Sequence, residues 1–414
     1  MSQIPPTPAG ALANIRVLDL SRVLAGPWAT QLLADLGAEV IKVERPGVGD
    51  ETRSWGPPFL KDAQGCDTSE AAYFLCANRN KKSITVDFTK PAGAALIREI
   101  AKTSDVVVEN FKVGGLKAYG LDYDSLRALN PRLVYCSITG FGQDGPDCNR
   151  PGYDALIQAV GGLMSVTGTP PAEGNPGYVK VGVAVVDLMT GLYASNAIMA
   201  ALLHRHASGA GQYIDTALLD VQVACMANQA SNYLVSGRSP GRLGSAHPNI
   251  VPYQDLPTAD GAVMLAVGND GQFARLCAAL GVGELAGDPR FVTNTKRVEN
   301  RAALIPLLSE ASRRRTSAHW EKTLEAAGVP CGPINDLATV FEVPQVKHRG
   351  LRMTMPHAAA GEVPLVASPL RLSASPVSYR SPPPLLGEHT ESVLAEVLGL
   401  DEAQIVELRR DKVI

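Results

Sequence analysis

The chain has 414 residues, of which 45% are hydrophobic and 19% charged, enough apolar material for two modest domains or one large one. With 38 basic and 41 acidic residues the formal net charge is −3, which argues against a broad basic surface for nucleic acid or anionic lipid. The 7 cysteines are odd in number and include no C-x-x-C pair, so we expect reduced cytoplasmic thiols and neither a disulfide framework nor a zinc site. The N-terminus shows no secretory signal pattern.

The first half of the sequence alternates short β-branched runs with helical stretches. Such alternation predicts βαβ units around a mostly parallel sheet, in which ligands bind at the carboxyl ends of strands. The expected strands are 15–21, 39–44, 83–88, 105–110 and 132–138, and the expected helices are 27–37 and 91–102.

The middle of the chain contains longer apolar segments. We expect an apolar strand over 179–186, a long apolar helix over 188–206 that ends at Gly209, and a hairpin of 253–257 with 262–267. The best membrane-span candidate, 186–203, contains Asp187, Thr190 and Asn196, so a buried helix of a soluble protein is the better interpretation. The expected division is a large α/β domain over 1–224, a small α+β domain over 225–345, and a segment 346–414 that returns to the large domain.

Several enzyme classes lack their motifs here. We find no phosphate loop of the type G-x-x-x-x-G-K-[ST] and no H-E-x-x-H. Glu44 ends the second predicted strand as in a dinucleotide site, but the preceding loop lacks spaced glycines and Pro27 removes an amide. A nicotinamide or flavin enzyme is therefore disfavoured.

Asp187 is the most informative polar residue. It lies between the predicted strand and the predicted apolar helix, where the simplest interpretation is an ordinary N-cap. Its apolar surroundings favour another interpretation, because a partly desolvated carboxylate is a stronger nucleophile and helix amides can stabilise its charge.

Basic residues near the strand ends are candidates for phosphate binding. Lys42 lies near the end of the predicted strand 39–44, Arg45 follows that strand, and the run 79–82 precedes the next one, although each alone is more often a solvated surface residue. Asn110 and Phe111 end another strand, where an amide could bond to a base and an aromatic ring could stack on it.

Taken together, these segments resemble the class III coenzyme A transferases, the family of formyl-CoA transferase and carnitine CoA-transferase. The matching segments are Val17-Leu18-Asp19, Ala25-Gly26-Pro27, Leu33-Ala34-Asp35-Leu36-Gly37-Ala38, Asn80-Lys81-Lys82-Ser83, Val108-Glu109-Asn110-Phe111, Asp187-Leu188 and Pro384-Leu385-Leu386-Gly387-Glu388-His389-Thr390. They span nearly the whole chain in order. The resemblance implies a Rossmann-like large domain from both chain ends, a smaller α+β domain, and a homodimer of interlocked chains.

The resemblance also implies the chemistry. Asp187 would attack an acyl-CoA thioester to form a mixed anhydride, then an aspartyl-CoA thioester, which an acceptor carboxylate would open. No metal or prosthetic group is expected; the CoA thioester is a substrate. The positions that match CoA contacts are Val23, Leu24, Ala25, Arg45, Val86, Lys90, Asn110, Phe111, Thr139 and Phe141.

Departures from formyl-CoA transferase suggest the substrates. Leu24 and Phe141 replace a glutamine and a tyrosine, which argues against formyl and oxalate groups, and residues 244–248 replace a glycine-rich loop. The sequence is closer to the succinyl-CoA:dicarboxylate branch, whose substrates carry a second carboxylate that needs a basic partner. The candidates for substrate binding are Tyr73, Arg53, Arg79, Gly244, Ser245 and His247, with Arg242 as a further cation.

Two alternatives remain at this stage. Racemases of 2-methylacyl-CoA esters carry Gly-His-Asp where this chain has Gly152-Tyr153-Asp154, and a neutral phenol is a poor base at pH 7. A CoA-binding relative that has lost catalysis is the non-enzyme alternative, which the intact Asp187 disfavours.

Overall fold

The computed structural model describes residues 10–172, 175 and 177–414, which form two compact units. The first unit runs through Gly162 and continues with Val181–Ala230 and Gln345–Ile414, and the second combines Leu163–Lys180 with Ser231–Pro344. Both chain ends therefore contribute to the first unit. The contacts group Leu163–Lys180 with the second unit, although this segment falls within the large domain expected over 1–224.

A six-stranded parallel sheet forms the centre of the first unit, in the order β5-β2-β1-β6-β7-β8. Its strands are β1 (Arg16–Asp19), β2 (Glu39–Glu44), β5 (Lys81–Thr85), β6 (Val106–Glu109), β7 (Val134–Thr139) and β8 (Tyr213–Ala217). The order reverses between β1 and β6, as in doubly wound folds, and ligands of such folds bind beside that reversal. The predicted mixed α/β fold with a parallel sheet is confirmed.

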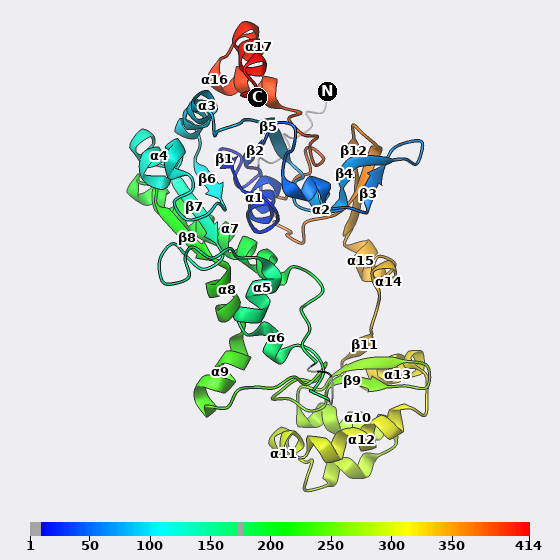
Figure 1. Cartoon of the computed structure of the whole chain (residues 1–414). Coiled ribbons are helices and arrows are strands. Elements are labelled where there is room, and N and C mark those ends of the chain that lie inside the picture. Colours follow the sequence, from blue (N-terminus) through cyan, green and yellow to red (C-terminus); the bar gives the residue numbers. More distant parts are fainter. Residues whose placement is uncertain (1–9, 173–174, 176) are drawn as a thin grey trace. The chain divides into compact units, whose positions relative to one another are not determined.

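Helices cover both faces of this sheet (Figure 1). One face packs against α1 (Ala25–Asp35), α5 (Asp154–Val160), α7 (Val185–Ser208) and α8 (Leu218–Cys225). The other packs against α3 (Pro91–Lys102), α4 (Tyr123–Leu129) and α16 (Thr390–Leu398). Burial on both faces explains the apolar sequence of central strands such as β6, which reads VVVE.

Helix α7 differs from its prediction at the N-terminal end. No strand forms over 179–186; the helix begins at Val185, so Asp187 lies in its first turn and Ala184 occupies the N-cap. The predicted end is confirmed, because Gly209 takes the left-handed conformation with φ 79°. Gly191 permits close packing: a Cβ there would lie 2.7 Å from the carbonyl oxygen of Ala25 in α1.

The outer face of α7 is apolar and exposed. In the described part of the chain, this is the single helix long and apolar enough to cross a membrane by length and composition, and 39% of its apolar window is buried. Core helices of soluble proteins pass the same test. The helix was expected to be buried, but Leu192 is 52% exposed and Leu203 73% exposed.

Shorter elements complete the first unit. They are η1 (Glu51–Ser54), β3 (Phe59–Lys61), β4 (Asp67–Ala71), α2 (Ala72–Leu75), η2 (Lys117–Tyr119), β12 (Arg352–His357), β13 (Gly361–Val366) and α17 (Glu402–Arg410); α9 (Ala227–Ser236) and α15 (Pro344–His348) lie at its boundaries.

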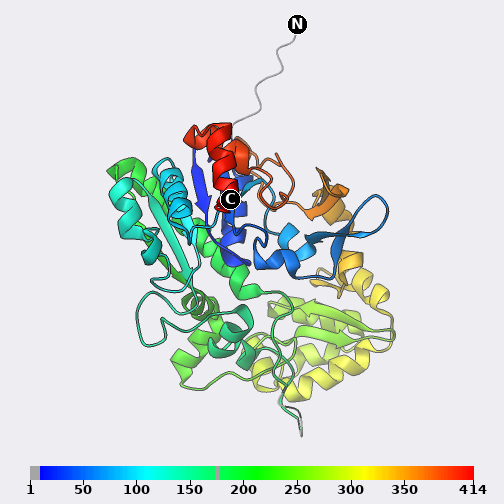
Figure 2. The ribbon, with the colours of Figure 1, turned by 45° about the horizontal axis from the view of Figure 1, so that its top comes forward.

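The second unit has its own core around the antiparallel sheet β11-β10-β9, which lies against helices in Figure 2. The hairpin of β9 (Tyr253–Pro257) and β10 (Ala262–Ala266) confirms the prediction, with β11 (Cys331–Pro333) added at the edge. The other elements are α6 (Leu163–Val166), α10 (Asp270–Leu280), η3 (Gly283–Gly287), α11 (Asn294–Glu299), α12 (Arg301–Ser312), α13 (Ser317–Ala326) and α14 (Leu337–Val340).

Candidate active site

A cavity of about 220 Å³ opens in the first unit beside the reversal of strand order. Its wall combines the loop after β1, the loop after β6, the end of β7 and the first turn of α7. The loops that follow β1 and β6 diverge to opposite faces of the sheet, which leaves room between them. Asp187 lines this cavity.

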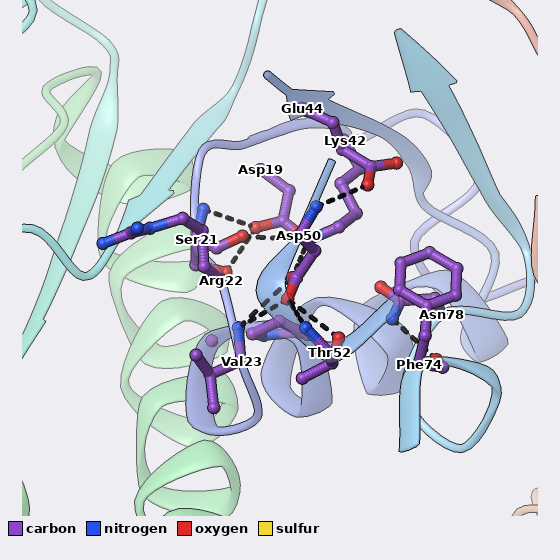
Figure 3. Close-up of polar contacts among 12 residues, drawn as sticks. Asp19, Ser21, Arg22, Val23, Lys42, Glu44, Asp50, Thr52, Phe74 and Asn78 are labelled. Atoms are coloured by element: carbon purple, nitrogen blue, oxygen red, sulfur yellow. Dashed lines mark hydrogen bonds and ion pairs between the residues drawn. The ribbon is translucent and has the colours of Figure 1, made fainter. Parts of the chain in front are cut away.

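Asp50 fixes the loop after β1 (Figure 3). Its carboxylate oxygens each lie 3.2 Å from the amide nitrogen of Val23, and they also accept bonds from Thr52 and Lys42. Val23 has φ 70°, a left-handed conformation that is costly for a β-branched side chain. The buried carboxylate thus holds a strained backbone at the cavity wall.

The amides at the start of α7 are occupied by a second carboxylate. Asp154, the first residue of α5, accepts hydrogen bonds from the backbone of Val186 at 2.8 Å and of Asp187 at 3.3 Å. The position of Asp187 at a predicted helix start suggests that these amides stabilise its own charge. Instead they stabilise Asp154, because its side chain reaches the helix N-terminus from another element.

Burial and, to a smaller extent, the negative charge of Asp154 together raise the pKa of Asp187 to about 7. Near neutral pH the group therefore exchanges between acid and carboxylate, and its carboxylate form is poorly solvated. A poorly solvated carboxylate is a stronger nucleophile than one in water.

Tyr73, in α2, lies within the electrostatic reach of Asp187. Burial and, second to it, the charge of Asp187 raise the pKa of Tyr73 to about 12, so the phenol stays neutral and can donate a hydrogen bond. Its ring packs edge-on against Trp55 with a centroid distance of 5.1 Å.

The structure brings most of the predicted CoA contacts together with Asp187. Those that line the cavity are Val23, Leu24, Ala25, Asn110, Phe111 and Thr139. Phe141 is buried just behind it, with the guanidinium carbon of Arg150, a lining residue, 4.7 Å from its ring centroid.

Three predicted CoA contacts lie outside the lining of this cavity. Arg45 is exposed after β2, and Val86 is buried after β5. Lys90 donates to the carbonyl oxygens of Asp411 and Lys412, at 2.8 and 3.0 Å, and so anchors the C-terminal end of the chain.

The buried cations of the first unit are bound to partners within the fold. Arg53 forms two hydrogen bonds with Glu44, and Arg79 forms two with Asp35. Lys42, a phosphate candidate from its sequence position, is fully buried against Asp50. Cations placed this way stabilise loops rather than face a ligand, because separating such a pair leaves a buried charge unpaired.

The remaining predicted substrate contacts belong to the second unit. Ser245 donates to Asp255, Gly244 is in the left-handed conformation with φ 64°, and the His247 ring packs on Tyr253 with a centroid distance of 5.4 Å.

Sequence reasoning missed several residues of the cavity wall. Arg22, Glu51, Cys148 and Arg150 line it. Tyr153, noted in the sequence only as the replacement of the racemase histidine, also lines it and is 65% exposed. Arg22 directly precedes the predicted contact Val23, which was a usable signal. Glu51 and Arg150 reach the wall through tertiary packing, which no local pattern reveals.

No group of three or more His, Cys, Asp and Glu side chains suited to a metal ion occurs within residues 10–172, 175 and 177–414.

Comparison with known proteins places this geometry in context. The sequence pattern of CoA-transferase family III matches residues 12–390. The succinate–glutarate CoA-transferase of Agrobacterium fabrum is 53% identical over 93% of this chain and 95% of its own length. The human succinyl-CoA:glutarate CoA-transferase is 48% identical over 96% of this chain and 88% of its own. A CAIB/BAIF family protein from Brucella suis superimposes with a TM-score of 0.82 at 50% identity, covering 94% of this chain and all of that one.

Proposed function

Because this chain belongs to CoA-transferase family III, we propose that it moves CoA from succinyl-CoA to a dicarboxylic acid, with Asp187 as the covalent nucleophile. That the chain is a CoA-transferase follows from its relatives at 48–53% identity. The observation that carries the proposal is the partly desolvated Asp187 carboxyl in a cavity lined by the predicted CoA contacts.

The names of the relatives support the choice of substrates. Two named above act on succinate or succinyl-CoA and glutarate, and a third relative, 35% identical along the full length of both chains, is a succinyl-CoA–D-citramalate CoA-transferase of Chloroflexus aurantiacus. Glutarate is therefore the first acceptor to test. Leu24, 5% exposed, gives the wall of the cavity that contains Asp187 an apolar side chain.

The proposed reaction has four balanced steps. The Asp187 carboxylate adds to the thioester carbonyl and expels CoA thiolate, which leaves an aspartyl–succinyl anhydride. The thiolate adds to the aspartyl carbonyl and expels succinate, which leaves an aspartyl-CoA thioester. The acceptor carboxylate then opens that thioester to a new anhydride, and the thiolate takes the acceptor's acyl group and frees Asp187. Covalent catalysis divides one slow exchange into easier steps.

The proposal assigns roles to the residues around Asp187. Val23, Leu24, Ala25, Asn110, Phe111 and Thr139 would contact the CoA chain, with Phe141 behind them. Arg45, Val86 and Lys90 stay predicted contacts of the nucleotide end. Tyr73 would donate to an oxygen of the acyl group, because its phenol stays protonated beside Asp187. Gly244, Ser245 and His247 stay predicted contacts of the acid substrate. Arg53 and Arg79 would not bind the substrate directly but would stabilise the loops of the first unit through their buried ion pairs.

We propose further that the enzyme is a cytoplasmic homodimer of interlocked chains without a prosthetic group. An exposed apolar stripe on α7 supports the dimer: Leu192, Met199 and Leu203 share one side of the helix and are 52%, 38% and 73% exposed. Monomeric proteins rarely expose apolar patches of this kind.

An exchange assay tests the function. Purified protein is incubated with succinyl-CoA and glutarate, and thioesters and acids are quantified by liquid chromatography. We expect glutaryl-CoA and free succinate in equal amounts. Absence of exchange with a panel of dicarboxylic acids would refute the proposal. Deuterium incorporation at the α-carbon of a 2-methylacyl-CoA, without any acceptor acid, would point instead to a racemase.

A further inference from the structure

Arg22 is held in the cavity wall by its backbone. Its amide donates to Oδ1 of Asn110 at 2.9 Å, and its carbonyl oxygen accepts from Nδ2 of the same side chain at 2.7 Å. Asn110 thereby joins the loop after β1 to the loop after β6 across the reversal of strand order. The backbone of Arg22 is therefore fixed in place, while its guanidinium group can exchange one hydrogen-bond partner for another.

The guanidinium group lies over an aromatic ring and is incompletely paired. Its central carbon is 4.7 Å from the ring centroid of Phe111, and its NH1 group donates to Oε1 of Glu51. Nε of Arg22 and Oε2 of Glu51 are both buried and have no hydrogen-bond partner among the described residues. A guanidinium fork and a carboxylate can form two parallel bonds, but this pair forms one.

Other cations contrast with this arrangement. Lys42 and Arg53 are at most 8% exposed in their side chains and are bound to buried carboxylates, so they cannot leave their partners cheaply. The Arg22 and Glu51 side chains are 41% and 44% exposed. An ion pair this exposed contributes at most about 1 kcal/mol, so a competing anion can replace Glu51.

We propose that Arg22 binds a phosphate group of the acyl-CoA nucleotide, and that Glu51 holds the guanidinium group over Phe111 until that phosphate arrives. This inference rests on the proposed function. A phosphate offers the planar fork two oxygens and a larger negative charge than Glu51 does. It also supplies the buried Nε with the acceptor that it lacks. Phe111, on the other side of the guanidinium group, keeps it at the cavity wall during the exchange.

The test compares two thioesters with the full-length protein. Succinyl-CoA carries the phosphates, whereas succinyl-pantetheine carries the same acyl group and thiol arm without any phosphate. We expect Arg22→Gln to raise KM for succinyl-CoA about 10-fold or more, as loss of a charged hydrogen bond does, with kcat within about 2-fold. Its kcat/KM for succinyl-pantetheine should stay at the wild-type value, and Arg22→Lys should recover part of the loss.

Two further variants sharpen the result. Glu51→Gln removes the competing carboxylate, so we expect it to lower KM for succinyl-CoA about 2- to 5-fold, and to have no such effect in the Arg22→Gln background. Arg16→Gln is the matched control, because Arg16 pairs with Glu39 outside the cavity, and it should change neither thioester's kinetics.

Three outcomes would overturn the inference. Equal loss on both thioesters would make Arg22 a structural residue. A raised KM for glutarate with unchanged KM for succinyl-CoA would assign it to the acid's carboxylate. An unchanged KM for succinyl-CoA in both Arg22→Gln and Glu51→Gln would leave it no role in binding. Failure of the proposed function looks different, because the wild-type enzyme would then exchange CoA from neither thioester.

Discussion

The neighbouring carboxylate of Asp154 affects the pH at which Asp187 is ionised and can react. Because it must be ionised to attack and its pKa lies at about 7, we expect kcat/KM for succinyl-CoA to rise with pH through about 7 and then level off. Asp154→Asn removes the neighbouring charge, so the midpoint of that rise should move to lower pH, while burial keeps it above the ordinary value of 3.8.

The pH–rate profile checks this prediction with Asp220→Asn as the control, an exposed carboxyl of α8 that should leave the midpoint unchanged. A midpoint equal in Asp154→Asn and wild type would show that Asp154 does not act on the nucleophile.

The same pKa shift predicts a change in stability. The carboxyl of Asp187 ionises at about 7 in the folded chain but near 3.8 when exposed, so the folded state loses stability as pH rises between these values, and the loss is complete above pH 7. We therefore expect Asp187→Asn to raise the free energy of unfolding by about 1–2 kcal/mol at pH 8, with a smaller gain at pH 5. Denaturant unfolding at the two pH values measures it. An equal effect at both would contradict the burial of this charge.

At the scale of elements, α1 and α7 must approach closely for the cavity to form. A Cβ on Gly191 would lie 2.7 Å from the backbone oxygen of Ala25 and 3.0 Å from Trp28. Gly191→Ala should therefore destabilise the protein by about 1–3 kcal/mol, although alanine favours helices. Gly271→Ala in α10 is the control, because its nearest contact is 3.4 Å and the change should be neutral or stabilising. Equal thermal shifts for both variants would refute the packing argument.

The loops that follow β1 and β2 depend on one buried ion pair. Asp50 lies 2.9 Å from Nζ of Lys42, and both side chains are fully buried. Asp50→Ala leaves that charge unpaired and frees the strained backbone of Val23, so we expect a loss of about 3–5 kcal/mol in urea unfolding. Glu99→Ala, which breaks an exposed pair with Lys102, should cost less than about 0.5 kcal/mol. Similar losses for both would contradict this account.

At the scale of the whole molecule, the exposed stripe of α7 should be covered by a second copy. Leu203→Glu places a charge at its most exposed member, and we expect the dimer to dissociate at micromolar protein concentration, with Kd raised at least about 10-fold. Light scattering after size exclusion gives the mass. Leu129→Glu on α4, which packs on the other face of the sheet, should leave the dimer intact. A dimer that persists in Leu203→Glu would place the interface elsewhere.

Local patterns predicted much of the fold but less of the site. The strand Glu39–Glu44 and the helix Pro91–Lys102 have their predicted bounds, because apolar periodicity and a proline at the start specify them. The strand expected over 179–186 is absent, since an apolar run does not reveal that Asp154 will cap a helix at Val186. Lys42 resembled a phosphate ligand for a related reason: its partner Asp50 is recognisable only in three dimensions.

The most direct test of the central claim is to trap the covalent intermediate. The protein is incubated with succinyl-CoA, treated with hydroxylamine, digested and analysed by mass spectrometry. The account predicts a hydroxamate on Asp187, no such product in Asp187→Asn, and loss of CoA exchange in that variant. A hydroxamate on another carboxyl group, or undiminished exchange by Asp187→Asn, would contradict it.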